Sequence, residues 1–502
     1  MWLQHFKNAA SVLVQAKSFM HIIHIASELA PIAKAGGLAD VVYGLCQETL
    51  KLKCTTEVIL PKYDCIDYKQ LTNLKVEQED IWVFAGSNRY NNTIWSANLG
   101  TLKIFLIESD HPKNLYDRGV IYGCSDDIDR FIYFSCAAMQ FLLQLEKQPD
   151  ILHLHDWHTS LIALLCQRNN YKLKSILTIH NLAHQGVCSI STLFSLGKDL
   201  LKDLDSSDSL NLLETGIIHA DCIAIVSPNY QKEIQTPEGG CGLDGLLRES
   251  QKKLVSVLNG IDQDYWNPAK DPYLKKNYST NELENVLKAK LINKCFLQKH
   301  LSLTQEKVPL VSCITRLVPQ KGPDLIEYAV IRTLELGGQF VLLGSVSQPN
   351  NDIKERFISL QKKYQNDNRA AILLMNDEAL AHLIFAASDL FIIPSLFEPC
   401  GLTQMIAMRY GTIPIARMTG GLVDTVFDID TSDNAFEKRN GFTFEFPDQQ
   451  GVNWALERAI ICYKNHEKWQ QIMKAGLNYD SSWEKSTKQY LCIYEELLSV
   501  KT

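Results

Sequence analysis

Short apolar runs, rich in leucine and β-branched residues, recur along the chain with amphipathic segments between them. This alternation is typical of buried parallel strands that are connected by helices. The runs of the first half are HIIHIAS, TEVILP, LKIFLIE, DILHLHD, SILTIHN, DCIAIVS and KLVSVLN. Those of the second half are PLVSCIT, QFVLLGS, AAILLM, DLFIIPS and TIPIAR. The pattern predicts an α/β protein with two doubly wound, Rossmann-like domains.

The two sets of runs are separated by a polar and charged segment without a comparable apolar run. We therefore expect an N-terminal domain over 20–262, a linker over 263–307 and a C-terminal domain over 308–481. Residues 1–19 are expected to form an extension, and 482–502 a last helix that crosses back to the N-terminal domain. Ligands of doubly wound folds bind at the carboxyl ends of the strands, so the expected site is a deep cleft that the two domains face.

Composition narrows the possible partners. Fifty basic and 57 acidic residues among 502 give a formal charge of −7, which offers no general attraction to nucleic acid or to an anionic membrane. No apolar run approaches the roughly 20 residues that span a bilayer.

The 14 cysteines are scattered without a CxxC pair and are typical of reduced core residues. Residues 1–19 contain Lys7 and Lys17 but no acid, which resembles a transit peptide; an ordinary extension and a bacterial cytoplasmic location are favoured over the plastid stroma.

A glycine pair follows the first expected strand. In the segment KAGGLAD, Gly36 and Gly37 allow a tight turn whose N–H groups approach an oxyanion, and Lys34 adds a cation. A glycine pair between strand and helix is often only a turn. Its place at the first strand of a doubly wound domain favours a binding role.

The second domain has a comparable set of charged residues. Arg316 and Lys321 follow the strand PLVSCIT, and Glu398 follows DLFIIPS in the segment LFEPCGLT, where a helix begins. Breaking a sugar–diphosphate bond creates negative charge on the leaving group and oxocarbenium character on the sugar. Each cation at ~4 Å contributes about 4 kcal/mol at an effective dielectric constant near 20. The arrangement therefore predicts nucleotide-sugar transfer.

Histidines end two strands of the first half, in HLHDWH (153–158) and IHN (179–181). Imidazoles and an aromatic ring suit a pocket that recognises sugar hydroxyls. A metal site is the competing interpretation, but a closed ligand set with carboxylate or thiolate spacing is missing. We expect no metal.

Together, the segments KAGGLAD, HLHDWH, TIHNLAHQG, LNGID followed by WNP, TRLVPQKG and FEPCGLTQMIAMRYGTIPI resemble the bacterial glycogen synthases and plant starch synthases. The resemblance runs from about Met20 to about Tyr494. EVILPKYDC and MRYGTIPIARMTGGLVDTVFD are especially similar to the soluble starch synthases. The resemblance implies a GT-B fold and retaining α-1,4-glucosyl transfer from ADP-glucose to the non-reducing end of glycogen, starch or a maltooligosaccharide. It implies no metal and no other cofactor.

The resemblance also implies a set of sugar-pocket residues in the N-terminal domain: Lys34, Gly36, Gly37, Asp40, His155, Asn181 and Asn259. Lys34 and the glycine pair would contact the diphosphate and glucose of the donor. His155 would approach the transferred glucose, mainly through its backbone carbonyl.

In the C-terminal domain, the resemblance implies that Arg316 and Lys321 neutralise the departing diphosphate. Glu398 would hold glucose hydroxyls and support the developing positive charge. The backbone N–H groups that face the ligand would be those of Cys400, Gly401, Leu402 and Thr403. Retention by front-face attack needs no second carboxylate, and the position eight residues after Glu398 is Ile406.

Two segments depart from the family pattern. The family commonly has FLKGG where this chain has LLETG at 212–216, and a base-stacking tyrosine where this chain has Asn376. An aromatic platform contributes roughly 1 to 3 kcal/mol to base stacking, so its loss leaves UDP-glucose open as a donor. A sucrose or trehalose-phosphate type of transferase and a catalytically silent glucan-binding or priming homologue are the alternative functions.

Overall fold

The computed structural model describes residues 20–189, 209–346 and 351–499, so the expected extension 1–19 lies outside the described residues. Two compact units divide the chain. Among the described residues, unit 1 comprises those up to Val226, Gln231–Gly260 and those from Trp483 onward. Unit 2 comprises Ser227–Tyr230 and Ile261–Ser482, so the segment 263–307, expected as a linker, belongs to unit 2.

The described part of unit 1 contains a nine-stranded sheet. Its strands, in spatial order, are β11 (Leu254–Ser256), β10 (Cys222–Ile225), β7 (Lys174–Ile179), β6 (Ile151–His155), β1 (His21–Ile25), β2 (Thr55–Pro61), β5 (Leu102–Ser109), β4 (Asn88–Leu99) and β3 (Thr72–Ala85). Pairing is parallel from β11 to β5, and β4 pairs antiparallel with both β5 and β3. A short second sheet pairs β8 (Val187–Ser189) with β9 (Ser209–Asn211).

Each of the seven apolar runs of the first half coincides with a parallel strand, whereas the sequence reasoning did not identify β3 and β4. The reason is their burial. Most of β3 is exposed and only alternate positions near its end, Ile81 and Val83, are buried. A strand with one solvent-exposed face lacks the continuous apolar run of a strand that is buried on both faces.

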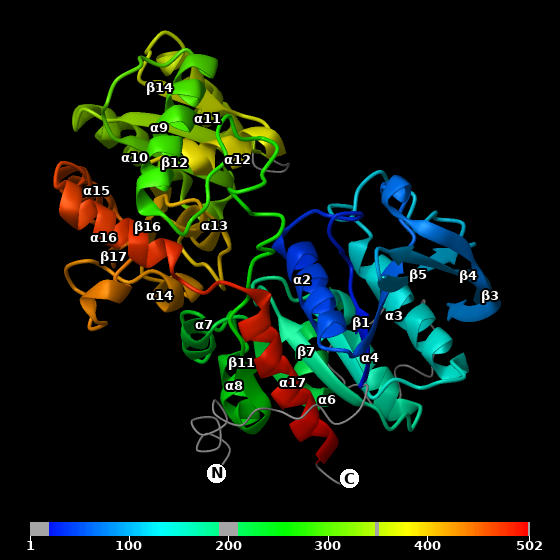
Figure 1. Ribbon diagram of the computed structural model, residues 1–502. Coiled ribbons are helices and arrows are strands. Elements are labelled where there is room, and N and C mark those ends of the chain that lie inside the picture. Colours follow the sequence, from blue (N-terminus) through cyan, green and yellow to red (C-terminus); the bar gives the residue numbers. More distant parts are fainter. Residues whose placement is uncertain (1–19, 190–208, 347–350, 500–502) are drawn as a thin grey trace. The chain divides into compact units, whose positions relative to one another are not determined.

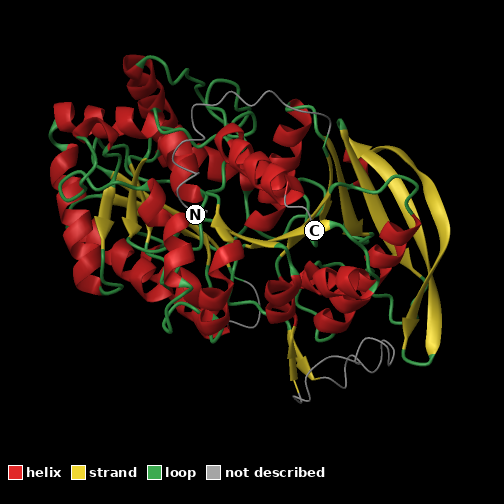
Figure 2. Cartoon of the chain, turned by 90° about the horizontal axis from the view of Figure 1, so that it is seen from below, coloured by secondary structure: helices red, strands yellow, loops and turns green. Residues whose placement is uncertain are grey.

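The helices of unit 1 cover its sheet on both sides, as the cartoon shows (Figure 2). They are α2 (Gly37–Lys51), α3 (Asp127–Gln144), α4 (Trp157–Arg168), α6 (Leu212–His219), α8 (Asp244–Glu249) and α17 (Trp483–Ser499), with 3-10 turns at Tyr68–Gln70 and Ser250–Lys253. The chain passes between the units near α7 (Pro228–Glu233), after Gly260 and after Ser482. Helix α17, red in Figure 1, packs beside α2, and its Trp483 indole lies against Gly44. A Cβ at Gly44 would lie 2.0 Å from the indole nitrogen, so only glycine fits there.

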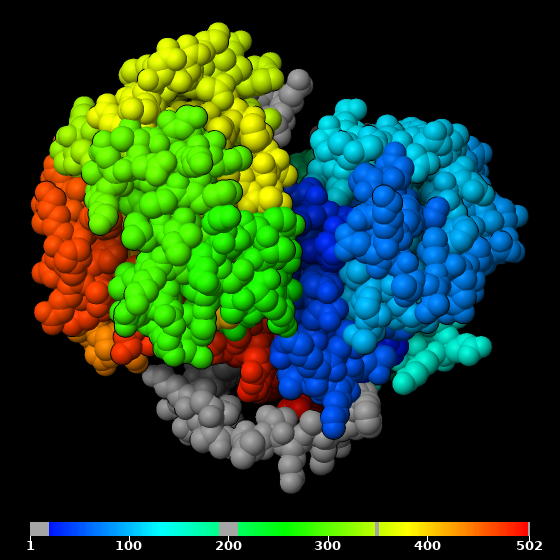
Figure 3. Space-filling view, turned by 45° about the horizontal axis from the view of Figure 1, so that its top comes forward, coloured from blue at the N-terminus to red at the C-terminus, as the bar shows by residue number. Residues whose placement is uncertain are grey.

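Unit 2 contains a six-stranded sheet within the described residues, and all of its pairings are parallel. The order is β14 (Ala370–Leu373), β13 (Gln339–Ser345), β12 (Leu310–Arg316), β15 (Leu390–Ile393), β16 (Ile413–Arg417) and β17 (Phe442–Phe444). The α-helices are α9 (Leu283–His300), α10 (Pro323–Glu335), α11 (Asn351–Tyr364), α12 (Glu378–Ala387), α13 (Thr403–Arg409), α14 (Gly421–Thr425), α15 (Gln449–Tyr463) and α16 (His466–Leu477). Two 3-10 turns lie at Pro319–Lys321 and Phe436–Lys438. The strands are almost wholly buried, so helices and loops form the outer surface of this unit, green through yellow to red in Figure 3.

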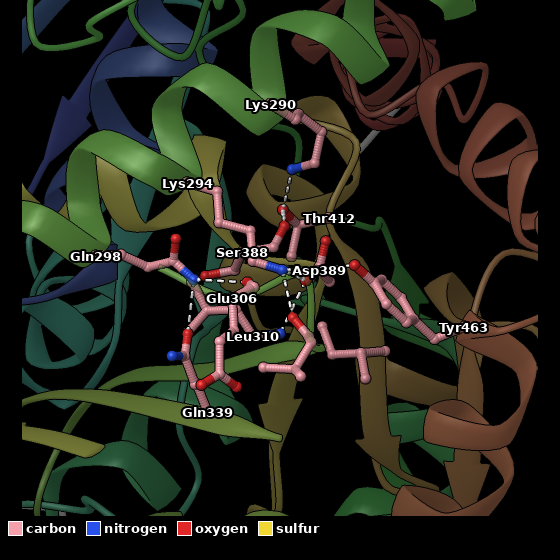
Figure 4. Close-up of polar contacts among 12 residues, drawn as sticks. Lys290, Lys294, Gln298, Glu306, Leu310, Gln339, Ser388, Asp389, Thr412 and Tyr463 are labelled. Atoms are coloured by element: carbon pink, nitrogen blue, oxygen red, sulfur yellow. Dashed lines mark hydrogen bonds and ion pairs between the residues drawn. The ribbon is translucent and has the colours of Figure 1, made fainter. Parts of the chain in front are cut away.

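Helix α9, inside the expected linker 263–307, is anchored to unit 2 by two buried lysines (Figure 4). Lys294 Nζ lies 2.5 Å from Asp389 Oδ2. Lys290 Nζ donates to Thr412 Oγ1 at 2.8 Å and to two backbone carbonyls. Burial lowers the pKa of Lys290 to about 7. The polar composition that suggested a linker therefore includes charges that fasten this helix to the domain.

In the described ranges, no helix is both long enough and apolar enough to cross a bilayer.

Candidate functional site

A buried carboxylate shapes the loop after β1. Glu28 Oε2 accepts hydrogen bonds from the backbone N–H groups of Ala35 and Gly36, each at 2.6 Å. The hydroxyl of Tyr122 donates to Glu28 Oε1 at 2.9 Å. The N–H of Gly36, which the sequence reasoning assigned to an oxyanion, is thus engaged by Glu28, and the helix α2 begins at the next residue, Gly37.

Lys34 and Asp40, two of the expected residues, form an ion pair in this loop. Lys34 Nζ lies 2.9 Å from Asp40 Oδ1, and the two side chains are 37% and 36% exposed. An ion pair of this exposure contributes at most about 1 kcal/mol, so exchanging Asp40 for a ligand anion costs Lys34 little. The pair holds the cation at the loop that Glu28 supports.

The described structure places His155 inside the sheet rather than at its surface. Its side chain is fully buried, and its ring nitrogens lie 3.1 Å from nitrogens of His24 and His180. Its carbonyl, expected to approach glucose, accepts a hydrogen bond from Thr159 Oγ1 at 3.0 Å. Of the two histidines at the carboxyl ends of β6 and β7, it is His180 that is partly exposed.

Three histidines have ligand atoms close enough to raise the question of a metal. The ligand atoms of His24, His153 and His155 all lie within 4.8 Å of one another. However, the rings of His153 and His155 stack with an interplanar angle of 13°, so their lone pairs do not converge on one point. Both nitrogens of His153 are also occupied, by Tyr494 Oη at 2.7 Å and Thr178 Oγ1 at 2.6 Å. This geometry favours a hydrogen-bond network over an ion.

Asp156 occupies an unusual backbone position between β6 and α4. Its φ of 55° lies in the left-handed region, which costs a non-glycine residue about 1 to 3 kcal/mol and is common at functional sites. Its carboxylate accepts hydrogen bonds from the backbone N–H groups of His180, at 2.7 Å, and Asn181, at 3.4 Å. Burial raises the pKa of Asp156 to about 7. The residue therefore positions the expected ligand residue Asn181 and is itself a candidate that sequence reasoning missed.

Asn259 follows β11 and is 5% exposed. Among the described residues, no donor reaches its buried Oδ1 atom. A buried polar atom without a partner costs about 1 to 3 kcal/mol, which a ligand hydroxyl would recover. This supports the ligand-binding role expected for Asn259.

In unit 2, the expected residues Lys321 and Glu398 form a close pair. Lys321 Nζ lies 2.5 Å from Glu398 Oε2, which also accepts a hydrogen bond from Ser395 Oγ at 2.8 Å. Glu398 is only 6% exposed. Arg316, at the end of β12, has an exposed side chain.

Glycines allow the loop that carries Glu398 to pack closely against two other loops of unit 2, those at Gly322 and at Gly420. Gly322, between Lys321 and α10, has a φ of 66°, and a Cβ there would lie 2.5 Å from the carbonyl oxygen of Pro394. The backbone of Gly420 and Gly421 packs closely against the 398–400 segment: an added Cβ would lie 1.9 Å from the carbonyl oxygen of Glu398 at Gly420, and 2.3 Å from that of Cys400 at Gly421. Sequence reasoning quoted this second pair only as part of the resemblance and gave it no role.

The expected N–H donors lead into α13, which begins at Thr403. Cys400 is buried, while Gly401, Leu402 and Thr403 are partly exposed. Gln404 Nε2 holds the turn by donating to the carbonyls of Cys400, at 3.1 Å, and Gly401, at 2.9 Å. The structure thus gathers Arg316, Lys321, Glu398 and 400–403 at the carboxyl ends of β12 and β15.

The two segments that depart from the family pattern have ordinary structural roles here. LLETG (212–216) forms the first part of α6, and a Cβ at Gly216 would lie 2.5 Å from Ser160 Cβ. Asn376 is exposed immediately before Asp377, the N-cap of α12.

The chain is similar to known proteins over most of its length. Residues 21–249 match the family model for the starch synthase catalytic domain, and residues 298–475 match glycosyl transferases group 1. A glycogen synthase of Protochlamydia amoebophila (strain UWE25) is 45% identical over 95% of this chain and 99% of that protein. A probable starch synthase 4, chloroplastic/amyloplastic, of Arabidopsis thaliana is 45% identical over 96% of this chain and 47% of that protein.

Two solved structures are similar as well. The catalytic domain of starch synthase IV from Arabidopsis thaliana, bound to ADP and acarbose, superposes with a TM-score of 0.90 at 45% identity, covering 96% of this chain and 100% of that one. A sucrose-phosphate synthase from Thermosynechococcus elongatus has a TM-score of 0.61 at 15% identity, covering 96% and 100%, and supports the fold alone. The expected α/β fold of two Rossmann-like domains is confirmed.

Proposed function

Because the chain belongs to the glycogen and starch synthase family of glycosyltransferases, we propose that it extends an α-1,4-glucan with glucose from ADP-glucose. The glucose is added at the non-reducing end with retention of configuration. The acceptor is glycogen, starch or a maltooligosaccharide. The observation that carries the proposal is the buried Glu398 carboxylate with the Lys321 ammonium 2.5 Å away.

The cations act on the leaving group. When the anomeric C–O bond breaks, the bonding electrons pass to the diphosphate of ADP, whose charge increases. Arg316 and Lys321, at the carboxyl end of β12, are the candidates to stabilise this charge in the transition state. Lys34 of unit 1, released from Asp40, is a third candidate.

Glu398 acts on the sugar. Its carboxylate is fixed by Lys321 and Ser395, so it can hold glucose hydroxyls and stabilise oxocarbenium character without reorganising. The acceptor hydroxyl oxygen bonds to the anomeric carbon on the face that the diphosphate leaves. Its proton passes to the departing phosphate oxygen. No second carboxylate, metal or cofactor takes part in the proposed steps.

The donor base and the compartment are finer parts of the proposal. The ADP bound in the similar starch synthase IV structure supports ADP-glucose as the donor. The exposed Asn376 supports measurable use of UDP-glucose. The compartment proposed is the bacterial cytoplasm, with the plastid stroma as the alternative. The relatives include proteins from bacteria and from a plant plastid.

The test is a glucosyl-transfer assay of the purified protein. Each donor, ADP-glucose or UDP-glucose, is combined with glycogen, a maltooligosaccharide, a sugar phosphate or no acceptor. The expected result is transfer to both glucans, faster with ADP-glucose, and a smaller UDP-glucose rate that falls in Asn376→Tyr relative to the ADP-glucose rate. Transfer to a sugar phosphate alone would establish the sucrose or trehalose-phosphate type of reaction. Binding of glycogen without turnover of either donor would establish the silent homologue.

A further inference from the structure

Three imidazole rings form a hydrogen-bonded chain that crosses the strands β1, β6 and β7. His24 Nδ1 lies 3.1 Å from His155 Nε2, and His155 Nδ1 lies 3.1 Å from His180 Nε2. Each ring therefore uses one nitrogen toward each neighbour. The first two rings are fully buried, and only His180 at the end of the chain is partly exposed.

The three rings are neutral, so what differs between possible states is which ring nitrogen carries the proton. Burial lowers the pKa of His24 and of His180 to about 3 and that of His155 well below its ordinary value. All three rings are therefore neutral near pH 7, and each carries one N–H. Two arrangements satisfy both hydrogen bonds: every ring protonated on Nδ1, or every ring protonated on Nε2.

The inner end of the chain distinguishes the two arrangements. His24 Nε2 is buried, and no described residue gives it a partner. Protonation on Nε2 would leave a buried N–H without an acceptor there, and orphaned buried N–H groups are rare in proteins. Protonation on Nδ1 leaves only a lone pair at that atom. The chain therefore runs from His24 through His155 to His180, with each Nδ1–H donating to the next Nε2.

A fourth ring keeps the middle of the chain in place. His153 stacks on His155 with ring centroids 4.4 Å apart and an angle of 13°. His153 is itself fixed at both nitrogens by Tyr494 and Thr178. A ring clamped in this way cannot turn over to exchange its two nitrogens.

We infer that His155 is a positioning residue, which together with His24 keeps the proton of His180 on Nδ1. His180 Nδ1–H has no hydrogen-bond acceptor among the described residues, so it is a donor that remains available to a ligand. This inference rests on the proposed function for its ligand, a hydroxyl group of the bound sugar. It also assigns His155 a role through His180 in place of the direct sugar contact expected from the sequence.

The test is the ring-nitrogen NMR spectrum of the full chain labelled with ¹⁵N-histidine, assigned by a His180→Gln variant. His155→Leu removes the donor to His180, and His155→Asn keeps an amide N–H close to the Nδ1 position. His21→Asn is the matched control, because His21 is a buried histidine of the same strand as His24 but pairs with Glu57. Turnover and thermal unfolding are measured for each variant.

The expected spectrum shows His180 protonated on Nδ1 in the wild type, in His155→Asn and in His21→Asn. In His155→Leu the proton moves toward Nε2, the tautomer that free neutral histidine prefers. The kcat of His155→Leu falls about tenfold, as for the loss of one hydrogen bond, with little change in the KM for glucan. His155→Asn keeps most of the turnover.

A wild-type His180 protonated on Nε2 would overturn the inference, and so would a His180 tautomer that does not change in His155→Leu. If His155→Leu does not fold, the wild-type spectrum still decides. The spectrum is read without substrate, so failure of the proposed glucosyl transfer would appear separately, as absent turnover beside the expected tautomer.

Discussion

Lys321 Nζ lies 2.5 Å from Oε2 of Glu398, and the same carboxylate oxygen accepts the hydroxyl of Ser395. Lys321 ends the 3-10 turn that precedes α10, while Glu398 lies in the loop between β15 and α13. The two residues are separated by 77 positions in the chain, and the parallel sheet brings them together because β12 and β15 are neighbours.

This pair predicts the effect of removing either charge. Glu398→Gln and Lys321→Ala should each lower kcat about 10²- to 10³-fold, the effect typical of losing one preorganised electrostatic group. The double variant should lose less than the product of the two, because each residue needs the other. Steady-state rates measure this. Glu327→Gln is the control: Glu327 lies on α10 and pairs with Arg356 of α11, so its loss should leave the rates normal. Unchanged turnover in Glu398→Gln would remove Glu398 from the mechanism.

The turn between Lys321 and α10 predicts a strong requirement for glycine. Gly322→Ala places a methyl group 2.5 Å from the carbonyl oxygen of Pro394 at a φ of 66°. It should lower the free energy of unfolding by at least about 1 to 3 kcal/mol and disturb the Lys321 position. Gly337→Ala is a matched control, with a φ of 82° and no atom within 4 Å of the added methyl. Denaturant unfolding should show a larger decrease in the free energy of unfolding for Gly322→Ala than for Gly337→Ala. Equal decreases would contradict a steric requirement for glycine at position 322.

Asp156 predicts a pH dependence of stability. Its pKa is about 7 in the folded chain and near 4 when unfolded. Between these values the folded state binds the proton and the unfolded state does not, so this residue makes stability fall as pH rises from 4 to 7, by at most about 1.4 kcal/mol per pH unit. Asp156→Asn should remove this slope. Asp80→Asn, at an exposed aspartate with a φ of 62°, should keep it.

Lys290 predicts a slope of the opposite sign in a higher pH range. Its pKa is about 7 when folded and near 10.4 when unfolded, so between these values only the unfolded chain binds the proton. Stability attributable to this residue therefore increases as pH rises from 7 to about 10. Lys290→Met should remove the increase, and Lys288→Met, at an exposed lysine of the same helix, should not. Unfolding curves recorded across this range, with the same slope in all three proteins, would contradict the assignment.

The sequence predicted the parallel strands because strands buried on both faces need continuous apolar runs, as in HIIHIAS and DLFIIPS. It also placed Lys321 and Glu398 correctly at carboxyl ends of strands, since that position follows from the strand itself. It missed β3, whose apolar side chains alternate with exposed ones.

The residues that sequence reasoning missed act through contacts that no local pattern encodes. Glu28 accepts two backbone N–H groups from residues seven and eight positions later, and Asp156 accepts two from positions 24 and 25 later. Gly420 is required by the carbonyl of Glu398, 22 positions earlier. Only their position in the sequence could have indicated a role. Glu28 and Asp156 each lie within three residues of the carboxyl end of a strand, where ligand-binding residues of this fold are expected.

The central claim is transfer of glucose with retention, and proton NMR of the reaction tests it most directly. With ADP-glucose and maltooligosaccharide as substrates, we predict one new α-1,4 anomeric signal for each ADP released. Release of ADP together with free glucose, or new signals of β configuration, would contradict the account.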